Sequence, residues 1–304
     1  MTHSHELLPA TVSDRPLGLI GIGLMGTAIA ERLLAAGAHV IGWDVSPERR
    51  DALTAAGGTS ANDAMEVLST CDRVLLSLPS HDTVQDVLES AESVLRHGQI
   101  LIDTSTGDPD AAEAQAARLA RRGVEYLDAT VSGSSQQLRE GTAVFLVGGT
   151  DSAFRACSDV LGSLTSKVYH TGPAGSGARM KLVTNLVLGL NRAALAEGLW
   201  FARTQGLDLE QTLFLLRESM SYSRIMDTKG EKMLRGDFAP QAKLSQHLKD
   251  VGLMLSTAGR ANASLPMTET HQRLLETAMQ MGLGDLDNSA VLRAFADQAS
   301  RSQE

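Results

Sequence analysis

The fold is decided near the amino terminus, where the chain reads Leu17-Gly18-Leu19-Ile20-Gly21-Ile22-Gly23-Leu24-Met25-Gly26. The first four residues are apolar and run into glycine, as expected of the first strand of a parallel sheet. The next six follow the pattern G-x-G-x-x-G. Its first glycine permits a tight turn, its second lets a pyrophosphate approach the backbone, and its third lets a helix pack closely on the strand. The segment from Thr27 to Ala36 then predicts a helix that stops at Gly37 and directs its N-terminus at the phosphates.

A second predicted strand runs from His39 to Trp43 and ends at Asp44, about 20 residues past the glycine motif, where an acid that binds ribose is expected. The alternative is a glycine-rich turn with an acidic cap. A carboxylate accepts hydrogen bonds from a free 2′-hydroxyl and repels a 2′-phosphate. We therefore expect NAD as the cofactor, with NADP as the alternative because Arg49 and Arg50 follow one turn later. The predicted cofactor contacts are Gly21, Ile22, Gly23, Leu24, Met25, Gly26 and Asp44.

Composition narrows the class of protein. The chain has 304 residues and a net charge of −9, and its positive residues are scattered, which argues against nucleic acid or an anionic membrane surface as partner. The longest apolar stretch, Leu182 to Ala202, contains charged and amide side chains and does not suit a bilayer. Two cysteines make no disulfide framework and suit a reducing compartment. We expect a soluble cytoplasmic protein that binds no metal.

Strand-like and helix-like segments alternate through the first half of the chain, and helical patterns alone continue from Gly175 onward. This order predicts an α/β fold with a doubly wound parallel sheet of the Rossmann type over residues 16–173. A flexible leader would cover residues 1–15, and its His3 and His5 suit a disordered tail better than a metal site. A long helix over residues 174–203 would join the sheet to an all-helical domain for substrate binding and oligomerisation over residues 204–304. The predicted strands are 17–20, 39–43, 72–78, 99–103, 123–128 and 142–149.

Lys181 stands inside the apolar segment from Ala178 to Ala202, one helical turn before Asn185. A charged amine in an apolar helix is costly unless it has a function or a partner. Residues at i and i+4 share a helix face, so both side chains would reach the same region. The alternative is a lysine that extends to solvent from a helix end. The nucleotide motif favours the functional interpretation, and we hypothesise that Lys181 and Asn185 are catalytic.

Several separated motifs agree with one another, and over about residues 17–295 the chain resembles the β-hydroxyacid dehydrogenases, such as 3-hydroxyisobutyrate dehydrogenase and tartronate semialdehyde reductase. The motifs are the glycine pattern, Leu78-Pro79, Asp103-Thr104-Ser105-Thr106, Asp128-Ala129-Thr130-Val131-Ser132-Gly133, Gly175-Ser176-Gly177 with Lys181 and Asn185, Lys249-Asp250, and Asp287-Asn288-Ser289-Ala290. The resemblance implies reversible hydride transfer between NAD(P) and the hydroxyl-bearing carbon of a small β-hydroxyacid.

The resemblance also assigns roles to residues. It implies that Lys181 is the catalytic lysine and that Asn185 is its neighbour on the same helix face. It implies that Ser132, Gly133 and Ser134 bind the substrate, and that Leu78, Pro79, Thr106 and Lys249 contact the cofactor. Burial lowers the pKa of a lysine toward neutrality, which suits an amine that must exchange a proton with a substrate hydroxyl. For Ser132 to Ser135 the alternative is a flexible surface turn, and for Lys249 a solvated charge on a helix.

The chain departs from the family pattern at Thr130, Ser134 and Thr184, where proline, glycine and asparagine are usual. The loop at Ser134 is therefore more polar than usual, and a larger sugar acid, such as threonate or 6-phosphogluconate, is an alternative substrate. Extra donors for it would come from Ser134, Gln136, Ser221, Ser223, Arg224 and Lys229. A redox-inactive nucleotide-binding protein is a further alternative, but Lys181 and the three glycines are present. The apolar helical half predicts a homodimer or homotetramer.

Overall fold

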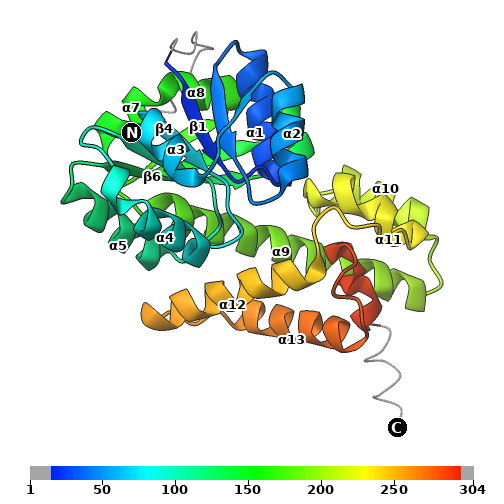
Figure 1. Ribbon diagram of the computed structural model, residues 1–304. Helices are drawn as coiled ribbons and strands as arrows, with labels where there is room; N and C mark the ends of the chain where they lie inside the picture. Colours follow the sequence, from blue (N-terminus) through cyan, green and yellow to red (C-terminus); the bar gives the residue numbers. More distant parts are fainter. Residues whose placement is uncertain (1–14, 296–304) are drawn as a thin grey trace. The chain divides into compact units, whose positions relative to one another are not determined.

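The computed structural model describes residues 15–295, and the chain divides into two compact units, Met1–Lys181 and Leu182–Glu304. The predicted leader with His3 and His5 lies outside the described residues, except for Arg15. One helix, α9 (Ser176–Thr204), runs without interruption from the first unit into the second (Figure 1).

The first unit is built on one eight-stranded sheet with the order β3-β2-β1-β4-β5-β6-β7-β8. Its order steps outward from β1 in both directions, as in a doubly wound sheet. All neighbouring strands are parallel except β6 and β7, where Asp128 pairs with Gly148 and Ser132 with Val144. The strands are β1 (Leu17–Ile20), β2 (Val40–Trp43), β3 (Thr59–Ser60), β4 (Arg73–Leu76), β5 (Ile100–Asp103), β6 (Glu125–Ser132), β7 (Val144–Gly148) and β8 (Val168–Gly172).

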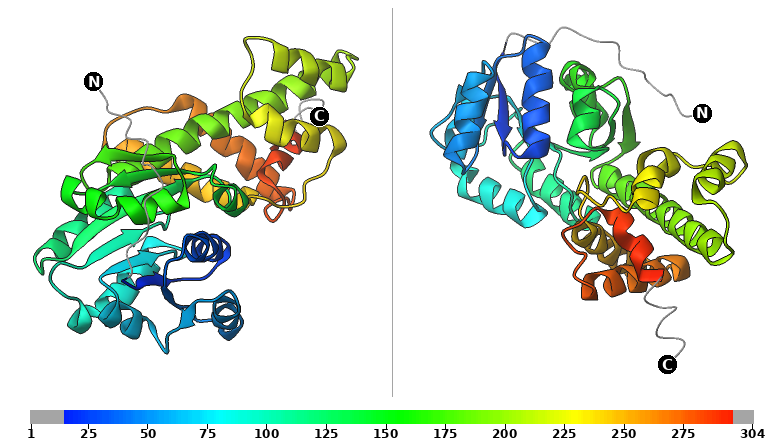
Figure 2. Two further views of the ribbon diagram at one scale, coloured as in Figure 1. Left: turned by 90° about the horizontal axis from the view of Figure 1, so that it is seen from above. Right: turned by 90° about the vertical axis from the view of Figure 1, so that its right-hand side faces the viewer.

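Helices cover both faces of this sheet (Figure 2). Successive residues of a strand point to opposite faces, so Leu75 of β4 enters one apolar core while Val74 and Leu76 enter the other. Helices α1, α6, α7 and α8 pack into the first core, and α3, α4 and α5 into the second. The helices are α1 (Leu24–Ala35), α2 (Pro47–Ala55), α3 (Ala64–Thr70), α4 (His81–Ser90), η1 (Glu92–Val94), α5 (Pro109–Ala120), α6 (Ser135–Arg139), α7 (Asp151–Ala156) and α8 (Ser158–Leu164).

The described part of the second unit is helical, apart from one isolated bridge between Lys243 and Asp287. Its core is a single apolar cluster that includes Leu195, Leu199, Leu244 and Leu275. The elements after α9 are α10 (Leu209–Glu218), the π-helical turn η2 (Met226–Gly230), α11 (Glu231–Arg235), α12 (Leu244–Arg260), α13 (Pro266–Gln280) and η3 (Asn288–Val291). Within residues 15–295, no helix combines the length and the apolarity needed to cross a membrane.

The predicted Rossmann-type sheet and helical second half are confirmed, with three local corrections. The first helix begins at Leu24, inside the glycine motif, rather than at Thr27. The short strands β3 and β8 were not predicted, because β3 has only two residues and β8 is rich in polar and aromatic side chains. The β7 strand is antiparallel to β6 because only eleven residues, including the one-turn helix α6, join them, and a parallel crossover needs a longer connection.

Candidate active site

The glycine motif forms the turn between β1 and α1. Gly21 has φ +91°, and a Cβ there would collide with the carbonyl oxygen of Ser77 at the end of β4. Gly26 lies so close to the Gly21 carbonyl that a side chain would separate α1 from the strand. A Cβ on Gly23 would contact only the Arg49 guanidinium, at an ordinary van der Waals distance of 3.5 Å. The turn therefore fits a pyrophosphate, because it leaves room above the middle glycine and presents the start of α1.

Asp44 lies at the carboxyl end of β2 and is 5% exposed. Its Oδ2 accepts a hydrogen bond of 2.6 Å from the Ile22 N–H, and its Oδ1 accepts one of 2.9 Å from the Ser46 N–H. The Arg49 guanidinium lies 3.5 Å from Oδ2, and Arg50 donates to the Asp44 carbonyl oxygen at 2.6 Å. The carboxylate thus holds the glycine turn in shape and keeps a negative charge where a ribose is expected, with two cations beside it.

The predicted cofactor contacts after β4 and β5 lie at adjacent strand ends. Leu78 is half-buried and Pro79 exposed, and the Leu78 N–H donates to the Ser105 hydroxyl at 2.9 Å. Thr106 follows directly and is exposed. Because β4 and β5 are parallel neighbours, these residues and the glycine turn occupy one edge of the sheet. This edge is where ligands bind in open α/β sheets.

The predicted substrate loop follows β6. Ser132 ends the strand and is half-buried, and Gly133 is exposed with φ +145°. Ser134 is the N-cap of α6: its hydroxyl accepts from the Gln137 N–H, and the Gln137 side chain accepts from the Ser134 N–H. Ser134 is therefore already used in a capping box. The segment forms the end of β6 and the capped start of α6.

Asp128, in the middle of β6, fastens the beginning of α9 to the sheet. It is 3% exposed, and its two oxygens accept hydrogen bonds of 2.8 Å each from the Gly175 and Ala178 N–H groups. The Thr130 hydroxyl adds a bond of 3.1 Å to the Gly177 carbonyl oxygen. Burial raises the pKa of Asp128, and the two N–H groups act in the opposite direction by stabilising the carboxylate. This clamp, defined by Asp128 and Thr130, sets the position of the helix that carries Lys181.

A side chain on Gly177 would collide with the Asp128 carbonyl oxygen and would meet Asp128 Oδ2 at 2.8 Å. The helix start can approach β6 only because this residue is glycine. Asp128 and Gly177 belong to two separate family motifs, and their contact was not predicted. A signal was present, since an acid inside an apolar strand requires donors from elsewhere in the fold.

Lys181 lies one turn past the clamp on α9 and is half-buried, and Asn185 lies one turn further on the same helix. In the second unit, the Asn185 amide donates to Asp250 Oδ2 at 3.4 Å. Asp250 belongs to α12, and its neighbour Lys249 is exposed. The structure thus joins two of the separated motifs, the one on α9 and the Lys249-Asp250 pair.

A second buried acid, Asp103, ends β5 and accepts a 2.5 Å hydrogen bond from the Tyr126 hydroxyl. Burial raises the pKa of both groups, and the proximity of the Asp103 carboxylate raises that of Tyr126 further. Together with Asp128, Thr130 and Ala178 they line a small cavity beneath the start of α9. The described residues contain no group of three or more His, Cys, Asp or Glu side chains suited to a metal ion.

Comparison with known proteins gives the site its context. Residues 16–172 match the NAD binding domain of 6-phosphogluconate dehydrogenase, and residues 175–295 match the NAD-binding domain of NADP-dependent 3-hydroxyisobutyrate dehydrogenase. The chain is 33% identical over 283 residues to 2-(hydroxymethyl)glutarate dehydrogenase of Eubacterium barkeri, covering 92% of this chain and 94% of that protein. The chain belongs to the β-hydroxyacid dehydrogenase family.

Two further relatives agree with this assignment. L-threonate dehydrogenase of Cupriavidus necator is 31% identical over 286 residues, which cover 93% of this chain and 96% of that protein. A solved structure of 3-hydroxyisobutyrate dehydrogenase from Mycobacterium tuberculosis, in complex with L-serine, has a TM-score of 0.87 at 26% identity and covers 93% of this chain and 99% of that one. The expected NAD(P)-dependent oxidoreduction of hydroxyacids is confirmed at the level of the family.

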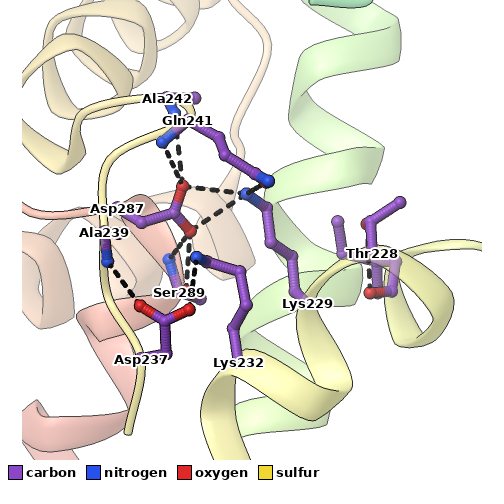
Figure 3. Close-up of polar contacts among 10 residues, drawn as sticks. Thr228, Lys229, Lys232, Asp237, Ala239, Gln241, Ala242, Asp287 and Ser289 are labelled. Atoms are coloured by element: carbon purple, nitrogen blue, oxygen red, sulfur yellow. Dashed lines mark hydrogen bonds and ion pairs between the residues drawn. The ribbon is translucent and has the colours of Figure 1, made fainter.

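Three of the six residues considered as extra donors for a longer substrate, Ser134, Gln136 and Lys229, have side-chain partners, whereas the buried Ser223 hydroxyl has none among the described residues. Figure 3 shows Lys229 of η2 pointing at Asp287, with its amine 2.9 Å from each carboxylate oxygen. Gln136 donates to Glu140 at 2.8 Å, and Ser134 caps α6. These side chains therefore stabilise the fold where they lie.

Proposed function

We propose that this β-hydroxyacid dehydrogenase interconverts a small β-hydroxyacid and its carbonyl form, with Lys181 as the group that exchanges a proton with the substrate oxygen. The observation that carries the proposal is the placement of Lys181, half-buried one turn beyond a clamp that binds the start of α9 to the sheet. The glycine turn and Asp44 would hold the cofactor, which supplies the hydride acceptor or donor when bound.

The protein's own groups divide the remaining work. Oxidation of the hydroxyl requires removal of a proton, and reduction requires stabilisation of an oxyanion, and a positioned amine serves both directions. Asn185, one turn along α9, is proposed to orient the substrate or the Lys181 amine without adding charge. Ser132 and Gly133, at the end of β6, are proposed to bind the carboxylate with a hydroxyl and backbone N–H groups. Leu78, Pro79, Thr106 and Lys249 are proposed cofactor contacts.

Replacement of the lysine tests this mechanism. Lys181→Ala should lower kcat at least a hundredfold while leaving NAD affinity nearly unchanged, because the glycine turn and Asp44 are untouched. The matched control is Arg179→Ala, which removes another cation from the same helix, one that pairs with Asp110 and Glu113 on α5. The role of Lys181 is wrong if its variant keeps more than about a tenth of the wild-type kcat, a loss of only about 1.4 kcal/mol.

We propose NAD as the preferred cofactor, because the Asp44 carboxylate is buried at the end of β2. We propose a substrate of few carbons, because Ser134, Gln136 and Lys229 already have partners. The second candidate is a sugar acid of the threonate type, favoured by the relative that acts on L-threonate. Turnover across hydroxyacids of two to six carbons, each with NAD and with NADP, decides between them.

We further propose a homodimer or homotetramer located in the cytoplasm. The support for assembly is a set of exposed large apolar side chains in the second unit, Phe201, Phe214, Leu215 and Met220. Sedimentation of the purified chain measures this directly, and a monomer at micromolar concentration contradicts it. The support for location is that Cys71 and Cys157 are buried free thiols whose pKa values burial raises to about 11 and about 12.

A further inference from the structure

Arg192, in the part of α9 that belongs to the second unit, is buried inside the helical core with 2% of its surface exposed. Its Nε and Nη2 atoms have no hydrogen-bond partner among the described residues. These two nitrogens form one edge of the guanidinium plane, the edge that binds an anion with two parallel N–H donors. Buried donors are nearly always satisfied in folded proteins, so an open guanidinium edge requires a partner.

Two buried histidines lie beside this arginine. His247 of α12 and His271 of α13 have ring centroids 5.1 Å apart, and the Nε2 atom of each lacks a hydrogen-bond partner among the described residues. Both rings press against Gly189 of α9, three residues before Arg192: a Cβ there would lie 2.7 Å from His247 Nε2 and 2.9 Å from His271 Cε1. Burial, and then the charge of Arg192, lower the pKa of His247 well below its usual value and that of His271 to about 4. Both rings are therefore neutral at pH 7.

The charges of this core do not balance. Figure 3 shows the neighbouring ion pair, in which Asp287 accepts hydrogen bonds from the Lys229 amine, the Ser289 hydroxyl and N–H, and the Gln241 and Ala242 N–H groups. Arg192 interacts with Asp287 through its charge, and no hydrogen bond joins them. Two buried cations thus share one buried carboxylate. A net charge of about one unit stays uncompensated, which is costly in an apolar interior.

We propose that the open edge of Arg192 binds one small monovalent anion, a halide or a small carboxylate, in the core of the second unit. The ligand neutralises the excess charge and accepts the Nε–H and Nη2–H donors, and the His247 and His271 rings supply further N–H donors in the tautomer protonated at Nε2. The site is structural and separate from the proposed reaction, since it stabilises the helical unit whether or not hydride transfer occurs.

Thermal unfolding of the full chain tests the proposal. The protein is unfolded and refolded in potassium chloride or potassium formate, so that the anion can enter a buried site. The reference is protein refolded at the same ionic strength in the potassium salt of a bulky organic sulfonate. The melting temperature should rise by about 5 °C at saturating chloride or formate. Arg192→Met should abolish that rise. The control is Arg217→Met, since Arg217 of α10 already pairs with Asp227 and Glu231, and this variant should keep the wild-type response.

A crystal of the wild-type chain refolded in bromide provides the second measurement. An anomalous peak within hydrogen-bond distance of Arg192 Nε and Nη2 supports the proposal. A water alone at that edge, or equal responses to chloride and formate in the wild-type and Arg192→Met proteins, overturns it. If Arg192→Met does not fold, the anomalous map of the wild-type crystal refolded in bromide decides whether the anion site exists. A response to formate without a response to halide assigns the site to carboxylates.

Discussion

Removal of the Asp128 clamp should loosen the helix that carries Lys181. Asp128→Ala leaves the Gly175 and Ala178 N–H groups buried without an acceptor, each at a cost of about 1–3 kcal/mol. Burial raises the pKa of Asp128, which means that the buried charge is itself costly, and removing this charge offsets part of the loss. We expect a net loss of about 3 kcal/mol in the free energy of unfolding. Asp128→Asn keeps one acceptor and should lose about half as much.

The same variants should affect catalysis selectively. A displacement of about 1 Å at a reacting group can lower the rate about a hundredfold. In Asp128→Ala we therefore expect kcat to fall by up to about a hundredfold, while NAD affinity is nearly unchanged. Urea unfolding measures the stability, steady-state kinetics the rate, and amide hydrogen exchange the protection of Gly175 and Ala178. Thr150→Ala is the control: it removes the N-cap of α7 at a cost of about 1 kcal/mol and should leave kcat intact.

If Asp128→Asn unfolds within about 0.5 kcal/mol of wild type and both amides stay protected, the two hydrogen bonds do not hold the helix start. If the stability falls as expected but kcat changes no more than in Thr150→Ala, Asp128 is a structural residue only. Lys181→Ala separates this failure from a failure of the proposed mechanism, because it removes the amine without touching the clamp.

Two further outcomes follow from the charges of the site and the core. Asp44→Asn keeps an acceptor for the Ile22 N–H but removes the charge that repels a 2′-phosphate. The ratio of kcat/KM for NADP to kcat/KM for NAD should therefore rise at least tenfold, which corresponds to about 1.4 kcal/mol. An unchanged ratio contradicts the role of Asp44 in cofactor choice. His271 is neutral in the folded protein and becomes charged in the unfolded chain at low pH. It should therefore lower the free energy of unfolding by about 3 kcal/mol as the pH falls from 6.5 through about 4. In His271→Leu the slope of unfolding free energy against pH should flatten across this window, and an equal slope contradicts the buried neutral state.

The sequence by itself determined those features of the molecule that depend on residues close together in the chain. The run from Leu17 to Gly26, followed by Asp44, predicts strand, turn, helix and acid in the correct order, because each depends on residues within one βαβ unit. The change from alternating strands and helices to helices alone predicted the two kinds of architecture. The spacing of Lys181 and Asn185 placed both on one face of α9, because helical periodicity depends on spacing alone.

What only the tertiary structure decided is how distant segments satisfy one another's polar groups. The Asp128 carboxylate meets donors 47 and 50 residues away, and no local pattern specifies that pairing. The capping box of Ser134, whose role in substrate binding stays a prediction, depends on where β6 ends and α6 begins. No role for Arg192 was predicted from the sequence, and only the packing of α12 and α13 against Gly189 encloses it with two histidines. Burial and partner choice are set by the whole fold, since they depend on which surfaces exclude water together.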